Sequence, residues 1–231
     1  MKIGLISIAT NNYTNFIEPL YKSADLFFCP NHEVSYFLFT NKEDYLPSCR
    51  RTVIKNIIQH EPWPHMTLKR FHIFEQYQQI LSEVDYLFYC DADMLFVDLI
   101  QDEILHDRVV TIHPGFFNKQ PKLFGYDDNP NSTAYIPRGA GRRYYAGGFN
   151  GGKSDLFLEM ASQLKNNIEK DLQKNVIAKW HDESHLNHYY NMVIRPTLEL
   201  TPSYCYPESW NIPFDKKLLA LNKNHKEYRN E

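Results

Sequence analysis

The sequence predicts an α/β fold with a mainly parallel central sheet. Short apolar runs typical of buried strands alternate with stretches of helical periodicity. The 231 residues suffice for one large hydrophobic core, and they contain no internal repeat and no clear linker. The expected strands are residues 2–9, 33–40, 52–59, 86–90 and 108–114.

Three helices are expected along the chain. Residues 16–28 and 67–84 have helical patterns, with apolar side chains at three- and four-residue steps in the second. A third helix begins near Ser154, a plausible N-cap, and has a long apolar stripe. Residues 115–145 show little periodicity and are expected to form loops with short strands. Residues 222–231 are polar and basic, as in a terminal tail.

Composition narrows the class of protein. A net charge of −3 gives no bulk attraction to nucleic acid or to an anionic membrane. No apolar stretch approaches the roughly 20 residues that cross a bilayer. The first residues lack the length and cleavage site of a signal peptide, so we expect a cytoplasmic protein. The four cysteines show no metal-binding or disulfide-scaffold spacing.

The stretch YLFYCDADMLF, at 86–96, ends an apolar run in two carboxylates. Strand alternation is expected to place Asp91 and Asp93 on one face and Ala92 on the other. A hard divalent cation, Mn²⁺ or Mg²⁺, would offset their repulsion and commonly also holds substrate phosphates. Ligands collect at the carboxyl ends of strands in open α/β sheets, where this pair lies. The alternative is a simple turn, since Asp is common just past strands.

A glycine-rich segment, YYAGGFNGGKS, occupies 144–154. Residues 147–154 match the phosphate-binding loop pattern G-x-x-x-x-G-K-[ST], and a helix is expected to follow. No buried strand is expected before the match, however, and no apolar run ending in Asp follows it. A glycine-rich wall that lets the backbone approach a substrate closely is favoured over a nucleoside triphosphatase.

The segment AKWHDESHLNHYY, at 178–190, gathers Trp180, His181, Asp182 and Glu183. Acidic residues in a first helical turn favour the helix dipole, which accounts for the acids but not for the Trp-His before them. A carboxylate beside a tryptophan suits the stabilisation of an oxocarbenium-like sugar centre.

Basic residues suited to an anionic ligand occur in two places. Lys69 and Arg70 open a predicted helix, where Arg70 suits bidentate phosphate contact; a solvated basic patch is equally consistent. The tail residues Lys223, Lys226 and Arg229 could close over an anionic ligand as a lid.

Taken together, these segments resemble glycosyltransferase family 6, which contains the ABO blood-group transferases and the α1,3-galactosyltransferase. The resemblance implies a single catalytic domain of GT-A type over residues 1–231. In it, 1–95 bind the nucleotide, 96–221 hold donor sugar and acceptor, and 222–231 close over UDP. The segments that carry the resemblance are SEVDYLFYCDADM (82–94), AYIPRGAGRRYYAGGF (134–149) and WHDESHLNHY (180–189).

The resemblance also implies roles for particular residues. Asp91 and Asp93 would hold Mn²⁺ (or Mg²⁺) against the diphosphate of a UDP-sugar. The implied catalytic residues are Asp182, which would bind the donor sugar, and Glu183, which would lie over its anomeric carbon. The other implied donor contacts are Ile8, Ala9, Tyr13, Arg70, Ala92, Ala146, Gly147, Gly148, His181, Lys223 and Arg229. The implied acceptor contacts are His113, Trp180 and Glu183.

The implied reaction is retaining transfer of GalNAc from UDP-GalNAc to the 3-OH of a galactose in an acceptor glycan. Small residues in the segment 145–148 leave room for an N-acetyl group and favour this donor over UDP-galactose. Many microbial family members have Asn at both aspartate positions and work without metal, so the two aspartates here predict metal dependence. Glu183 would either attack C1 or stabilise a short-lived oxocarbenium ion.

Acceptor identity is less constrained. Gly125 replaces a threonine usual in the family, and the family's acceptor-contacting acid has no clean counterpart near Glu208. A fucosyl-α1,2-galactose is the commoner preference of microbial relatives. Two other classes compete with the transferase: a P-loop nucleoside triphosphatase, and a sugar-binding module, which would leave the aspartate pair and basic residues without a purpose.

Overall fold

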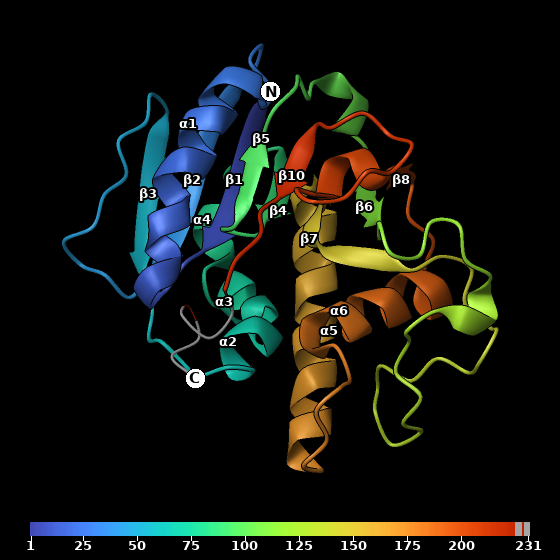
Figure 1. Ribbon diagram of the computed structural model, residues 1–231. Coiled ribbons are helices and arrows are strands. Elements are labelled where there is room, and N and C mark those ends of the chain that lie inside the picture. Colours follow the sequence, from blue (N-terminus) through green and yellow to red (C-terminus); the bar gives the residue numbers. More distant parts are fainter. Residues whose placement is uncertain (225–227, 229–231) are drawn as a thin grey trace.

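The computed structural model describes residues 1–224 and Tyr228, and a seven-stranded sheet lies at its centre (Figure 1). The strands run in the order β3-β2-β1-β4-β7-β6-β8. All neighbours pair in parallel except at β7, which is antiparallel to both β4 and β6. This confirms the expected α/β fold. The strands are β1 (Lys2–Ile8), β2 (Glu33–Thr40), β3 (Thr52–Ile57), β4 (Tyr86–Cys90), β6 (Arg108–Ile112), β7 (Tyr145–Lys153) and β8 (Leu198–Leu200).

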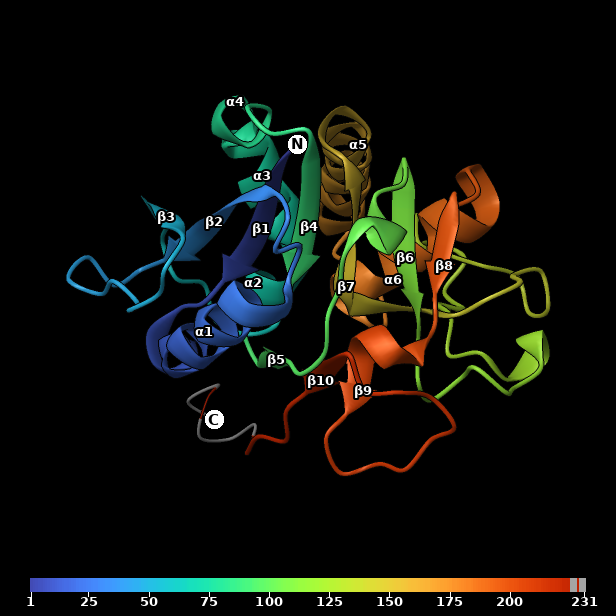
Figure 2. The ribbon, with the colours of Figure 1, turned by 90° about the horizontal axis from the view of Figure 1, so that it is seen from above.

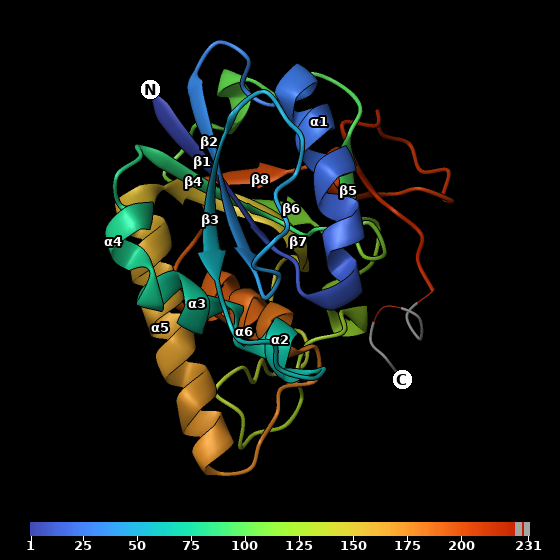
Figure 3. The same cartoon turned by 90° about the vertical axis from the view of Figure 1, so that its left-hand side faces the viewer.

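Helices cover both faces of the sheet. In Figure 3, α1 lies on one side of the sheet, and α3, α4 and α5 lie on the other. Strand alternation explains the layers: Leu5 packs into the cluster that contains α1, and Ile6 packs into the cluster that contains α3 and α5. Among the described residues, no helix is long and apolar enough to span a bilayer. The α-helices are α1 (Ile17–Phe27), α2 (His65–Leu68), α3 (Arg70–Gln76), α4 (Gln78–Leu81), α5 (Ser154–Gln173) and α6 (His181–His188).

A second, three-stranded sheet brings the end of the chain back to the DAD motif. It contains β5 (Met94–Phe96), β9 (Tyr206–Pro207) and β10 (Leu218–Ala220), with β10 in the middle. Figure 2 shows these short strands together, with the C-terminal segment leading away from β10. The pairing of β5 with β10 continues into a hydrogen bond from the Leu221 amide to the Asp93 carbonyl (2.9 Å).

The prediction of one continuous helix over residues 67–84 is wrong. The structure has three short helices there, α2, α3 and α4, with breaks at Lys69 and Tyr77. The break at Lys69 separates two neighbours with different environments. Lys69 pairs with Glu61 near the surface, whereas Arg70 turns into the interior.

The glycine-rich segment is a strand of the main sheet and not a loop. Residues 145–153 form β7, which pairs with β4 and β6. The sequence of this segment does not predict a strand, because glycine has low strand propensity. The N-cap expected at Ser154 is also wrong: Ser154 is the first helical residue, and its hydroxyl donates to the Val84 carbonyl.

Candidate active site

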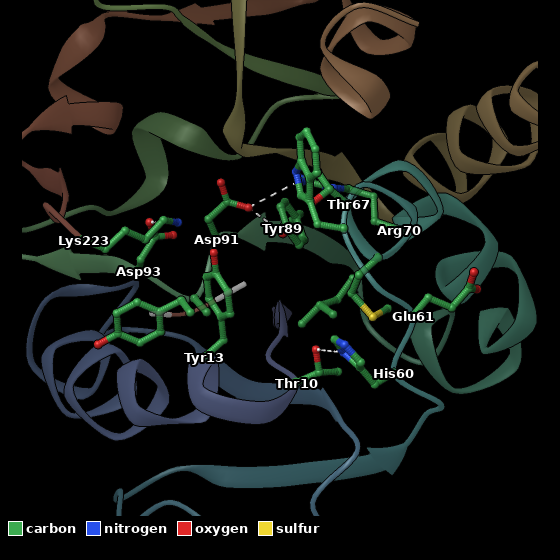
Figure 4. A pocket seen from close by; sticks show the side chains of 15 residues that line it. Thr10, Tyr13, His60, Glu61, Thr67, Arg70, Tyr89, Asp91, Asp93 and Lys223 are labelled. Carbon is green, nitrogen blue, oxygen red and sulfur yellow. Dashed lines mark hydrogen bonds and ion pairs between the residues drawn. The ribbon is translucent and has the colours of Figure 1, made fainter. Parts of the chain in front are cut away.

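A pocket opens where β1 and β4 end, at the carboxyl edge of the parallel strands. In Figure 4, Asp93 and Lys223 lie at one end of the pocket, and His60 and Glu61 lie at the other. This is the position at which open α/β sheets bind ligands. The pocket is lined by Ile8, Thr10, Tyr13, His60, Glu61, Trp63, Met66, Thr67, Arg70, Tyr89, Asp91, Ala92, Asp93, Lys223 and Tyr228.

The two aspartates of the DAD motif lie in a turn, and the expected alternation along a strand is wrong. β4 ends at Cys90, and the Asp91 amide donates to the Gly148 carbonyl (2.9 Å). The turn still brings Asp91 and Asp93 into one pocket, while Ala92 between them is buried against the core. The motif therefore presents two carboxylates together by a different local geometry.

Each aspartate already has a positively charged neighbour. Asp91 accepts a hydrogen bond from the Tyr89 hydroxyl (2.6 Å) and lies 3.4 Å from the Arg70 guanidinium. The Lys223 ammonium is 2.5 Å from an Asp93 carboxylate oxygen. Burial raises the pKa of Asp93, and nearby Asp91 raises it further, while Lys223 acts in the opposite direction. The pair is therefore a site that requires positive charge.

Arg70 connects this pair to the acids of α6. Its Nε is 2.9 Å from an Asp182 carboxylate oxygen, and one of its terminal nitrogens is 3.4 Å from Asp91. The other terminal nitrogen donates to the Gly147 carbonyl (3.1 Å), and the guanidinium lies over the Tyr89 ring. A planar, always-charged fork suits these simultaneous contacts, which an ammonium group could not reproduce.

Glu183 is held by two donors at the start of α6. Its carboxylate accepts hydrogen bonds from the Gly147 amide (2.8 Å) and the Tyr144 hydroxyl (2.9 Å). Burial raises the pKa of Glu183 to about 7, against the effect of these two hydrogen bonds. Burial also raises the pKa of adjacent Asp182 to about 6, with Arg70 opposing the rise. Two close carboxyl groups with raised pKa values are typical of a catalytic site.

An aromatic wall extends from Glu183 to the predicted acceptor contacts. The Tyr144 ring packs edge-on against His113 (5.5 Å between centroids) and at a tilt of 35° against Phe116 (4.4 Å). Trp180 is half-exposed and donates its indole N–H to the Gly125 carbonyl (2.8 Å). Burial lowers the pKa of His113 to about 4, so its imidazole is neutral at pH 7.

Most of the predicted donor contacts that the structure describes come together, and Ala9 is the exception. Ile8, Tyr13, Arg70, Asp91, Ala92, Asp93 and Lys223 line the pocket. Ala146, Gly147 and Gly148 lie in β7 beside it, with Gly147 facing Asp182 and Glu183. His181 begins α6, and its ring packs edge-on against Trp63. Ala9 is buried behind the pocket with its amide on Phe39, and Arg229 and Lys226 lie outside the described residues.

Sequence reasoning missed one wall of the pocket, the tyrosines Tyr89 and Tyr144, and the pocket residues Thr10 and Tyr228. His60, Glu61, Trp63, Met66 and Thr67 form that wall. They follow the strand β3, so the rule that ligands meet the carboxyl ends of strands could have indicated them. Tyr89 and Tyr144 were visible only as aromatic residues, because their hydroxyl partners lie on distant or turn segments.

The carboxylate pair fits a hard divalent cation. Within residues 1–224 and Tyr228, no group of three or more His, Cys, Asp or Glu side chains is placed to hold a metal by itself. Mg²⁺ and Mn²⁺ prefer oxygen ligands, and Mg²⁺ commonly uses one or two carboxylates with substrate phosphates and water. The carboxylates of Asp91 and Asp93 line the pocket and supply oxygen ligands of that kind, and the Lys223 ammonium now contacts one of them.

The phosphate-binding loop match is not a loop in the structure. Residues 147–153 of the match lie in β7, where 149–153 pair with β4 and the Gly147 amide donates to Glu183, and Ser154 begins α5. Lys153 forms an ion pair with Asp107 (2.8 Å) and does not line the pocket. A P-loop needs free backbone amides around a phosphate, so this segment does not support a nucleoside triphosphatase.

The mainly parallel central sheet, with helices on both faces, is consistent with a glycosyltransferase fold of GT-A type. A model of glycosyltransferase family 6 matches residues 1–230. The chain therefore belongs to glycosyltransferase family 6, as its sequence segments indicated.

Named relatives share the whole length of this chain. It is 33% identical to histo-blood group ABO system transferase 1 of Rattus norvegicus, over 99% of this chain and 68% of the relative. It is 32% identical to globoside alpha-1,3-N-acetylgalactosaminyltransferase 1 of Gallus gallus, over 100% of this chain and 70% of the relative. It is 30% identical to the O-antigen biosynthesis glycosyltransferase WbnI of Escherichia coli, over 99% and 97%.

Proposed function

We propose that the protein transfers GalNAc from UDP-GalNAc to the 3-OH of a galactose, with retention, to form an α1,3 bond. The observation that carries this proposal is the position of Arg70 between Asp91 on one side and Asp182 on the other. It links a site for a diphosphate and its cation to two carboxyl groups suited to a sugar. The donor would then lie with UDP in the pocket and its sugar beside Gly147 and α6.

Asp91 and Asp93 are the residues that would hold Mn²⁺ or Mg²⁺. A bound cation would offset the charge that develops on the departing diphosphate. Lys223 would serve the same diphosphate from the C-terminal segment, because its ammonium lies at the same end of the pocket. Tyr13 packs under that ammonium and lies in the 3₁₀ helix Asn11–Phe16 that follows β1, where the uridine is expected.

The donor preference rests on the surface of β7. A methyl group built on Gly147 would lie 3.5 Å from Asp182 and Glu183, so the glycine leaves this volume open next to both acids. An N-acetyl substituent requires such space. The name of the Gallus gallus relative refers to transfer of this sugar, which favours UDP-GalNAc. UDP-galactose is the alternative donor for the same reaction.

Glu183 is the proposed catalytic residue and Asp182 the proposed donor-sugar ligand. The bond between C1 and the diphosphate oxygen breaks, and its electron pair leaves with UDP. The carboxylate of Glu183 either attacks C1, forming a bond that breaks again in the second step, or stabilises the positive charge there. The acceptor oxygen then bonds to C1 on the original face, and its hydroxyl proton passes to a phosphate oxygen of the departing UDP. Tyr144 and Gly147 fix the carboxylate in place for both routes.

The acceptor would approach along the aromatic wall. The indole face of Trp180 is accessible, and the neutral imidazole of His113 can share a hydrogen bond with a sugar hydroxyl. A galactose with α1,2-linked fucose is the proposed acceptor.

A donor-by-acceptor screen with Mn²⁺ tests the proposal. UDP-GalNAc, UDP-galactose and UDP-glucose would each be offered to galactosides with and without α1,2-linked fucose. We expect the highest turnover with UDP-GalNAc and the fucosylated galactoside, and an α1,3 linkage in the product by NMR. Absence of transfer from every UDP-sugar, despite UDP binding, would overturn the proposal.

A further inference from the structure

Among the described residues, no strand lies beside one edge of the first part of β7. β4 ends at Cys90, opposite Phe149, where the chain turns into the DAD motif. The backbone of residues 143–147 therefore extends past the end of β4 with N–H and C=O groups that need partners. Unpaired buried backbone groups are costly, so something other than a strand must satisfy them.

Side chains of α6 and the π-helix Tyr189–Val193 occupy this edge. Glu183 accepts from the Gly147 amide (2.8 Å). Asn187 accepts from the Tyr145 amide and donates to the Tyr145 carbonyl (both 2.8 Å). Asn191, in the π-helix, accepts from the Arg143 amide (3.3 Å) and donates to the Arg143 carbonyl (3.0 Å).

The spacing of these contacts is regular. Steps of four residues along the helix advance about 6 Å. Steps of two residues along the strand advance about 6.6 Å, so the two repeats stay in register over three positions. Each asparagine also donates to the carbonyl four residues before it, Asn187 to Glu183 and Asn191 to Asn187 (both 2.9 Å). The amide group is thereby fixed in one orientation.

We propose that Asn187 is a positioning residue that fixes Glu183 and the donor-sugar segment of β7 relative to each other. It rests on the function proposed above, because the relative position of Glu183 and Gly147 affects the reaction only if the donor sugar lies beside both residues. Asn187 is 1% exposed, and neither the pocket nor the predicted acceptor wall includes it. Its effect on the reaction would therefore pass through the residues that it holds.

Asn187→Asp removes the two hydrogen bonds that the Asn187 side chain donates, with little change in the shape of the side chain. The carboxylate can still accept from the Tyr145 amide, but it loses both N–H donations and places oxygen against the carbonyls of Tyr145 and Glu183. A misplacement of about 1 Å at a reacting centre can cost about 10²-fold in rate. We expect kcat to fall by about tenfold to a hundredfold.

The accompanying measurements separate positioning from general damage. Donor KM and UDP affinity are expected to change by less than about threefold, since the nucleotide pocket is formed by other residues. Faster hydrogen exchange is expected at the amides of Tyr145 and Gly147. Asn166→Asp, on the exposed side of α5, adds the same charge and is expected to leave kcat unchanged.

An unchanged kcat in Asn187→Asp, or a loss that follows weaker UDP binding, would overturn the inference. If Asn187→Asp does not fold, Asn191→Asp tests the same row one step farther from Glu183. It is expected to lower kcat about threefold to tenfold, and a wild-type kcat there would overturn the inference too. Failure of the wild-type protein to release UDP from any UDP-sugar would instead count against the proposed function.

Discussion

Arg70 and Asp182 form a buried ion pair, with Nε and Oδ2 separated by 2.9 Å and both side chains less than a tenth exposed. The two residues come from α3 and α6, on either side of the site. Their contact joins the pocket for the nucleotide to the carboxyl groups for the sugar. Substitutions in this small region are therefore expected to change the stability of the fold, the choice of donor sugar and the pH dependence of activity.

Removing Arg70 is expected to destabilise the fold strongly. Arg70→Met would leave the buried carboxylate of Asp182 without its partner, and breaking a buried pair costs about 3–5 kcal/mol. Urea unfolding at pH 7 measures the change in the free energy of unfolding. The adjacent Lys69→Met is the control, because its pair with Glu61 is about a third exposed and contributes no more than about 1 kcal/mol. Equal losses of unfolding free energy in Arg70→Met and Lys69→Met would contradict a stabilising role for the buried pair of Arg70 with Asp182.

Activity is expected to depend on the ionisation of Glu183. The carboxylate is the active form, and burial raises the pKa of this residue from 4.5 to about 7. Since the charged fraction grows as pH rises, kcat/KM should increase about tenfold per pH unit below the pKa and level off above about pH 7. The same shift means that ionising Glu183 costs folding stability as the pH rises from about 4.5 to 7.

Glu183→Gln provides the matched test of that pH profile. It keeps the shape of the side chain but cannot ionise, so we expect turnover to fall by about 10²- to 10⁴-fold with UDP affinity retained. The residual activity should lack the acid limb near pH 7. Retention of wild-type turnover would remove Glu183 from the mechanism.

The size of residue 147 is expected to decide donor preference. Gly147→Ala places a methyl group at ordinary contact distance from Asp182 and Glu183, so the fold should accept it. The added group fills space proposed for the N-acetyl substituent. We expect kcat/KM for UDP-GalNAc to fall about tenfold or more relative to UDP-galactose, within the range for one methyl group in a pocket. A ratio equal to that of the wild type would place the N-acetyl group elsewhere.

Lys153 distinguishes the transferase from a P-loop enzyme. Lys153→Ala removes only a surface pair with Asp107, and UDP affinity measured by calorimetry is expected to stay within about twofold. A P-loop lysine contacts the phosphates directly, so its loss would abolish nucleotide binding. Competition with ATP and GTP in the same titration should show a preference for UDP.

The parallel half of the sheet could be predicted from sequence because its strands are buried on both faces. Leu5 and Ile6 are both apolar yet face opposite cores, which gives a continuous apolar run. The strand β7 could not be predicted in this way. A methyl group at Gly151 would lie 2.3 Å from the Leu87 carbonyl, so the neighbouring strand requires glycine where strand propensity argues against it.

The site likewise contains residues that local sequence predicts and contacts that it does not predict. Residues in compact motifs, such as Asp91 and Glu183, could be identified from their neighbours in sequence. The contact between Arg70 and Asp182 joins positions 112 residues apart (182 − 70), and nothing local to either residue predicts it. The turn geometry of Asp91 also depends on a distant partner, because the Gly148 carbonyl anchors its amide.

The central claim is a UDP-sugar transferase that uses Asp91 and Asp93 to hold a divalent cation. The most direct measurement is UDP release from UDP-GalNAc, with acceptor present, by protein stripped with EDTA and by the same protein after Mn²⁺ is restored. We predict negligible release after stripping and recovery on adding Mn²⁺. Asp93→Asn should recover far less. Equal release in EDTA and in Mn²⁺ would contradict the account.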